Sequence, residues 1–147
     1  MQPELPGEAA EIPGKAAEVP EDALVIRFRP TAPEDVLRWA DKEYRRIGRY
    51  RLSVFADVKR GSETDDDLRR RLLRVSELRI DPAKNPKYFV CTRSEELLKR
   101  GFTFWKDGDD DEETDEHYSV DMGTGATLED VVRFLEAFGL AEKRPKS

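Results

Sequence analysis

The chain is poor in the residues on which many catalytic and metal sites depend. Its 147 residues include one histidine and one cysteine. A single histidine excludes two-histidine metal sites and the HExxH motif, and a single cysteine excludes an internal disulfide. Cys91 lies in the apolar stretch KYFVC, where burial is expected rather than thiolate chemistry. The sequence therefore predicts no metal, no cofactor and no cysteine nucleophile.

Long apolar runs are also missing. No stretch approaches the roughly 18 apolar residues of a membrane span. The opening MQPELPGEAAEIPG lacks the basic and apolar regions of a secretory signal. These features predict a cytoplasmic protein that does not enter a membrane. Arginine outnumbers lysine 17 to 9, a ratio that hints at a bacterial genome rich in GC.

The net charge of −6 conceals a segregation of charge along the chain. Residues 1–35 carry −5, residues 36–101 carry +7 and residues 102–147 carry −8. A fold that brings the ends of the chain beside its middle would pair these charges, whereas a fold that separates them would present a basic and an acidic face. The sequence is compatible with both arrangements.

The first 22 residues contain a degenerate seven-residue repeat, LPGEAAE, IPGKAAE and VPEDALV. A proline in every repeat opposes a coiled coil, and the apolar content is mostly alanine. We therefore expect a disordered leader over 1–22, a single domain over 23–140 and a charged tail over 141–147.

Strand and helix patterns alternate through the expected domain. Strands are predicted at 23–29, 50–58, 87–91 and on both sides of the acidic run 107–116; helices are predicted at 31–48, 64–76, 94–100 and 127–139. Four threonines stand three residues before an acid, as in a capping box: Thr31, Thr64, Thr92 and Thr127. The order β-α-β-α-β-α-β-β-α, with strands that alternate in polarity, predicts an α+β fold. Its sheet would have about five strands and be covered by helices on one face.

The run DGDDDEETDE at 107–116 raises the question of a metal cage or a docking surface. Aligned as a calcium loop from Asp107, it has Glu112 where glycine is required and Tyr118 where a bidentate glutamate is required, so the cage is rejected. A solvated hairpin loop and a docking surface for a basic partner both fit the composition. The residues predicted for this binding surface are Trp105, Asp109, Asp110, Asp111, Glu112, Glu113, Asp115 and Glu116.

One catalytic arrangement is compatible with the pattern. His117 and Ser119 alternate onto one face of their strand, and Ser53 and the arginines 27 and 29 are expected on exposed strand faces. If these faces converge, Arg27, Arg29, Ser53, His117 and Ser119 could cleave a phosphodiester or clamp a pyrophosphate.

The segment GTGAT at 123–127 has the setting of a phosphate cradle between strand and helix. It lacks the third glycine and the P-loop lysine, so a connecting loop is the favoured interpretation.

Two arginine-rich segments, 45–51 and 68–74, bear on nucleic-acid binding. In the second, three aspartates stand one turn before three arginines, which favours a salt-bridged helix over a nucleic-acid surface.

Together these features predict a small non-catalytic module of the accessory, inhibitor or immunity type. It would bind a protein partner through segregated charge and the acidic hairpin. The alternative is a small toxin-like enzyme, with ribonuclease or ADP-ribosyltransferase activity, acting on RNA or a nucleotide.

Overall fold

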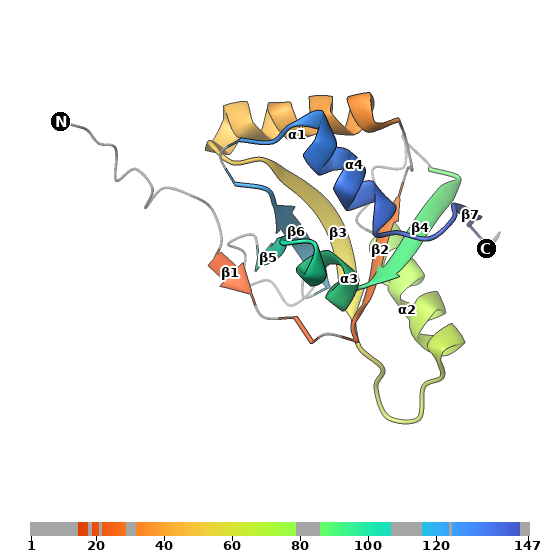
Figure 1. Ribbon diagram of the computed structural model, residues 1–147. Helices are drawn as coiled ribbons and strands as arrows, with labels where there is room; N and C mark the ends of the chain where they lie inside the picture. Colours follow the sequence, from red (N-terminus) through yellow and green to blue (C-terminus); the bar gives the residue numbers. More distant parts are fainter. Residues whose placement is uncertain are drawn as a thin grey trace.

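The computed structural model describes residues 15–17, 19–20, 22–28, 32–78, 86–106, 116–123 and 125–144. Within these ranges the chain forms one seven-stranded antiparallel sheet and four helices (Figure 1). The α+β class expected from the sequence is confirmed. None of these helices is long and apolar enough to cross a membrane.

The seven strands form a single sheet with β3 at its middle. Its spatial order is β1 (Lys15–Ala17), β5 (Thr103–Lys106), β6 (His117–Asp121), β3 (Arg51–Asp57), β2 (Leu24–Phe28), β4 (Tyr88–Arg93) and β7 (Glu142–Lys143). The five strands expected from the sequence are β2 to β6, in the predicted chain order. Two short strands, β1 and β7, extend the sheet at its two edges.

Helices lie on both faces of the sheet, so the predicted coverage of one face is wrong. On one face α1 (Pro33–Ile47), α4 (Leu128–Glu136) and α3 (Ser94–Lys99) pack over a core that includes Val25 and Val54. On the other, α2 (Asp65–Glu77) packs over Ile26 and Phe55, and in Figure 1 it lies below the sheet while α1 and α4 lie above. Val25 and Ile26 are both fully buried, because β2 is central and covered on both sides.

Two of the four predicted capping boxes are present. Thr64 accepts a hydrogen bond from the amide of Asp67, and Thr127 accepts one from the amide of Asp130; each aspartate bonds back to the cap amide. The first helix instead begins at Pro33 after Ala32, without a side-chain cap, and Thr31 lies outside the described residues. The box predicted at Thr92 is also wrong. Because β4 continues to Arg93, Thr92 is a strand residue, and its hydroxyl donates to the carbonyl of Ala137 at 2.6 Å.

The fold extends into both segments predicted to flank the domain. Residues 1–14, most of the expected leader, lie outside the described residues. Farther on, β1 pairs with β5, Val19 packs against the core beneath α1 and α4, and the carbonyl of Pro20 accepts a hydrogen bond from the hydroxyl of Ser94. At the other end β7 pairs with β4, and Arg144 donates to the carbonyl of Pro86 at 2.5 Å.

Candidate functional site

A serine and the single histidine meet on the face of the sheet that carries α2. The register of β3 with β6 places Ser53 opposite Ser119 and Phe55 opposite His117, so alternate residues of the two strands share this face. His117 Nε2 lies 3.2 Å from Ser53 Oγ, and its ring lies 5.3 Å from the ring of Phe55. Ser53 is exposed and Ser119 is buried. Three of the five residues predicted for the catalytic arrangement therefore lie together.

Arg27 does not join them. The pairing of Ile26 with Phe55 puts Arg27 on the opposite face of the sheet, under α4. Its side chain is buried, its guanidinium carbon lies 5.9 Å from the centroid of Phe134, and burial lowers its pKa to about 10. The expected exposed position of Arg27 is thus wrong. Arg29 lies outside the described residues.

A different arginine shares the face of Ser53. Arg51 precedes Ser53 by two residues on β3, and its Nε donates to Asp121 Oδ2 at 3.1 Å. Arg49 donates to both oxygens of the same carboxylate, at 3.2 and 2.8 Å. Trp105, predicted as a binding residue, lies half-buried against this pair, with its ring centroid 4.5 Å from the guanidinium carbon of Arg51 and 5.8 Å from that of Arg49.

Asp121 organises this cluster. It lies at the end of β6, and its Oδ1 also accepts the amide of Gly123 at 2.6 Å, in a turn where Gly123 has a φ of 83°. Burial alone would raise the pKa of Asp121, but the hydrogen bonds from Arg49, Gly123 and Arg51 outweigh it and lower the pKa below the ordinary value. Sequence reasoning missed Arg49, Arg51 and Asp121 as a unit. The available signal was Arg51, which begins an otherwise largely apolar strand. An arginine that is buried in such a strand needs an acidic partner.

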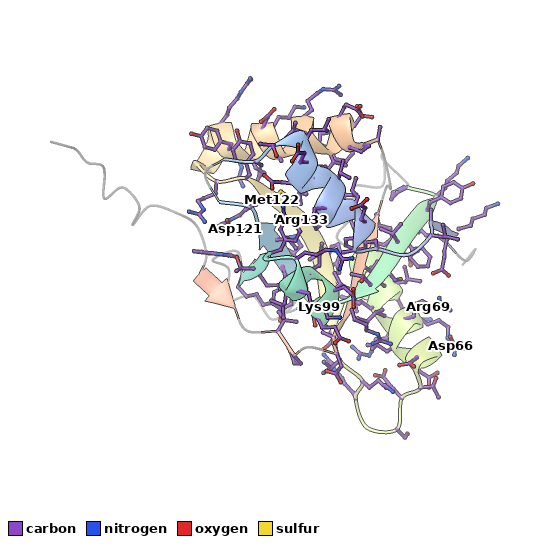
Figure 2. All side chains as sticks on the ribbon, viewed as in Figure 1. Asp66, Arg69, Lys99, Asp121, Met122 and Arg133 are labelled. Carbon is purple, nitrogen blue, oxygen red and sulfur yellow. The ribbon has the colours of Figure 1, made fainter. Side chains whose placement is uncertain are left out.

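A pocket of about 320 Å³ lies beside Asp121, where β6 ends and β5 begins. Figure 2 labels three of its lining residues, Asp121, Met122 and Arg133. Arg133 projects from α4, donates to the carbonyl of Arg100 at 3.1 Å and to Asp130 at 3.0 Å, and lies over the ring of Phe102. The remaining lining residues are Arg49, Gly101, Phe102, Thr103, Gly123, Gly125 and Asp130.

Of the predicted acidic surface, the structure describes Trp105 and Glu116. Asp109, Asp110, Asp111, Glu112, Glu113 and Asp115 lie outside the described residues. Glu116 is described, and its side chain is 13% exposed, with Oε2 3.5 Å from Arg60. Its carbonyl accepts the amide of Ala56 at 2.9 Å. Glu116 therefore closes the base of the hairpin against β3.

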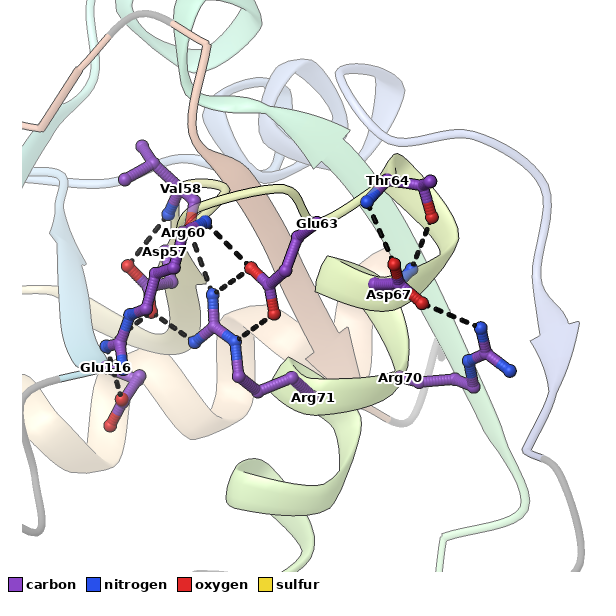
Figure 3. A network of polar contacts seen from close by, with 9 residues as sticks. All are labelled: Asp57, Val58, Arg60, Glu63, Thr64, Asp67, Arg70, Arg71 and Glu116. Carbon is purple, nitrogen blue, oxygen red and sulfur yellow. Dashed lines mark hydrogen bonds and ion pairs between the residues drawn. The ribbon is translucent and has the colours of Figure 1, made fainter.

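The arginines of α2 form ion pairs within the fold. Arg69 pairs with Asp66 and Arg70 with Asp67, each three residues apart, as the sequence predicts for a salt-bridged helix. Arg71 reaches back to the loop before α2: its Nε and Nη2 bind the carboxylate of Glu63 at 2.7 and 2.9 Å, and its Nη1 binds an oxygen of Asp57 at 2.6 Å (Figure 3).

Ion pairs also connect the basic middle of the chain to its acidic last third. Arg49 and Arg51 pair with Asp121, and Arg69 pairs with Glu142. Of the two arrangements compatible with the segregated charges, the described residues show internal pairing. This pairing reduces the positive charge that segments 45–51 and 68–74 could offer to nucleic acid.

The described residues hold no group of three His, Cys, Asp or Glu side chains that could bind a metal ion, and the acidic run 109–115 lies outside them. Chemically, the arrangement offers a hydroxyl beside an imidazole, a tryptophan that packs against Arg49 and Arg51, and a polar pocket. The pocket is lined by two ion pairs, Arg49 with Asp121 and Arg133 with Asp130. Comparison of the chain with models of protein families, with curated proteins and with solved structures finds no match.

Proposed function

We propose that the protein is a non-catalytic, cytoplasmic interaction module of the accessory, inhibitor or immunity type. It would dock a basic protein partner through the acidic hairpin between β5 and β6. The observation that supports this most is the contrast between two parts of the chain. The arginines of the basic middle are largely engaged in ion pairs inside the fold, whereas residues 107–115 contain seven acids and no lysine or arginine.

The hairpin has a firm base from which to present these carboxylates. β5 and β6 pair from Thr103–Asp121 to Trp105–Ser119, and Glu116 is tied to β3 through its backbone. Closely spaced carboxylates on a short tether create a local negative potential, which speeds the encounter with a basic surface. Trp105, at the end of β5, is of a residue type enriched at protein interfaces.

The test compares two variants with equal charge changes. In the hairpin variant Asp109, Asp110 and Asp111 are replaced by asparagine. In the control the exposed helical residues Glu34, Glu129 and Glu136 are replaced by glutamine. A partner captured from the native host is then mixed with each protein by stopped flow at two ionic strengths. We expect slower association and a flatter salt dependence for the hairpin variant alone. Equal association rates for the two variants would contradict the proposal that the hairpin docks the partner.

A second candidate function rests on the contact between Ser53 and His117, 3.2 Å apart. A hydroxyl held by an imidazole on an open strand face is compatible with a toxin-like enzyme acting on RNA or a nucleotide. Expression in a heterologous bacterium distinguishes the two functions. Growth arrest that His117→Ala abolishes would favour the enzyme, and normal growth with the wild-type chain would favour the interaction module.

A further inference from the structure

The pocket beside Asp121 has the size of a small-molecule site. Its volume of about 320 Å³ lies at the lower end of the range found for ligand pockets. It is framed by the turn before β5, the turn after β6 and the first turns of α4, so elements distant in sequence converge on it. The segment 123–127, set aside as a connecting loop in the sequence, forms part of its wall through Gly123 and Gly125.

Two ion pairs line this pocket, and a third arginine shares one of their carboxylates. Asp121 is shared by Arg49 and Arg51, and Asp130 is paired with Arg133. The four charged residues that line the pocket sum to zero, and Arg51, which does not line it, brings the cluster to a formal charge of +1. This positive charge favours an anionic occupant.

The two arginines that line the pocket are held in place and keep donors to spare. Arg49 uses Nε and Nη2 on Asp121 and lies near the ring of Trp105; Arg133 uses Nε on a backbone carbonyl and Nη1 on Asp130 and lies over Phe102. Within the described part of the chain these bonds leave Nη1 of Arg49 and Nη2 of Arg133 for another acceptor. A guanidinium already fixed in position loses little conformational entropy when it binds an oxyanion.

Gly125 adds a feature that the fold does not require. Gly101 and Gly123 have φ values of 87° and 83°, so their turns favour glycine. Gly125 has no such backbone conformation, and a Cβ added to it would meet no atom within 4 Å. Neither strain nor packing therefore demands glycine at 125. Its missing side chain leaves the backbone of the pocket wall open to close approach by a ligand.

We propose that this pocket binds a small oxyanion, a carboxylate or phosphate group, between Arg49 and Arg133. The binding would use charge-assisted hydrogen bonds from the spare guanidinium donors, which suit planar and tetrahedral oxyanions alike. The pocket lies at the end of the β5–β6 pair formed by Thr103 and Asp121, opposite the end, Lys106 and His117, from which the acidic run continues. It is therefore independent of the proposed docking function.

Amide NMR titrations of the full chain test this directly. Inorganic phosphate and acetate are titrated separately, each against sodium chloride at equal ionic strength, and the amides of Gly101, Gly123 and Gly125 report on the pocket. We expect saturable shifts of these amides with at least one oxyanion and not with chloride. Saturation with phosphate or with acetate identifies which group the site takes. Shifts that do not saturate with either would overturn the proposal.

Two variants and a control separate binding from folding. Arg133→Gln should weaken oxyanion binding about tenfold, because it removes a charged donor, while the capping box of Thr127 and Asp130 keeps α4 intact. Gly125→Leu should weaken binding without lowering the thermal midpoint. Arg74→Gln makes the same charge change at an exposed position of α2 and should leave binding unchanged. Equal affinity in the Arg133 and Arg74 variants would contradict the proposed site.

Discussion

Arg51 and Asp121 form an ion pair in which each side chain is only 1% exposed. They stand opposite each other at the end of the β3–β6 ladder, and Trp105 covers the arginine. Charges removed from water are tolerated only when hydrogen bonds replace the lost hydration. Arg49 and the amide of Gly123 complete that requirement for the carboxylate.

The first prediction concerns this buried pair. Asp121→Ala should lower the free energy of unfolding by about 3 kcal/mol, because it leaves Arg51 charged in a buried position. Arg49→Gln should cost less, about 1 kcal/mol, because Arg49 is 24% exposed and leaves Arg51 and Asp121 paired. Urea denaturation of both variants measures the difference. Equal losses of unfolding free energy in the two variants would show that the burial of Arg51 does not determine the destabilisation.

The second prediction concerns acid. Hydrogen bonds from Arg71 and from the amide of Arg60 lower the pKa of Glu63 to about 2 from its ordinary value of 4.5. A carboxyl whose folded pKa lies below its unfolded value stabilises the fold fully above the unfolded value, and this contribution is lost as pH falls through the folded value. Stability should therefore decline between about pH 4.5 and 2.

The variant Glu63→Gln isolates this effect. The free energy of unfolding of this variant should decline less steeply over the same pH range, because the titrating carboxyl is gone. Some acid sensitivity should remain, since the pKa of Asp121 is also lowered. The measurement is the urea midpoint as a function of pH for both proteins. Parallel curves would mean that the contacts of Arg71 with Glu63 do not persist in solution.

Local sequence signals predicted much of the fold. Thr64 with Asp67 and Thr127 with Asp130 cap helices as expected, because a capping box depends only on residues within one turn. The alternation of Leu52, Val54 and Ala56 placed these residues correctly in one core. The class and chain order of the five main strands followed from these elements.

The errors arose where burial depends on distant segments. Arg27 was expected on an open strand face, but that face is covered by α4. This helix lies more than one hundred residues after Arg27 in the sequence. The run Ala23–Ile26, apolar without interruption, was the available sign of a strand buried on both sides. The site around Asp121 depends on the register of β3 with β6, which the sequence does not specify, so its arginines could not be assigned a common partner.

The third prediction concerns divalent cations. Millimolar calcium or magnesium should raise the thermal midpoint only slightly, as a salt effect, because the run at 107–116 lacks the glycine and the bidentate glutamate of a calcium loop. The hairpin variant with Asp109, Asp110 and Asp111 replaced by asparagine is the control. A saturable rise with micromolar affinity, abolished in this variant, would establish a metal site in the hairpin.

The fourth prediction concerns the amino-terminal segment, which composition alone marks as dispensable. Two truncations, of residues 1–14 and of residues 1–22, differ by β1 and the contacts that follow it. The longer truncation removes the pairing of Lys15–Ala17 with β5, the packing of Val19 and the hydrogen bond from Ser94 to Pro20. It should therefore cost about 2 kcal/mol more than the shorter one, from a few hydrogen bonds and one half-buried valine. Urea denaturation measures both. Equal stability of the two truncated proteins would show that β1 contributes nothing and that the domain begins at Ala23.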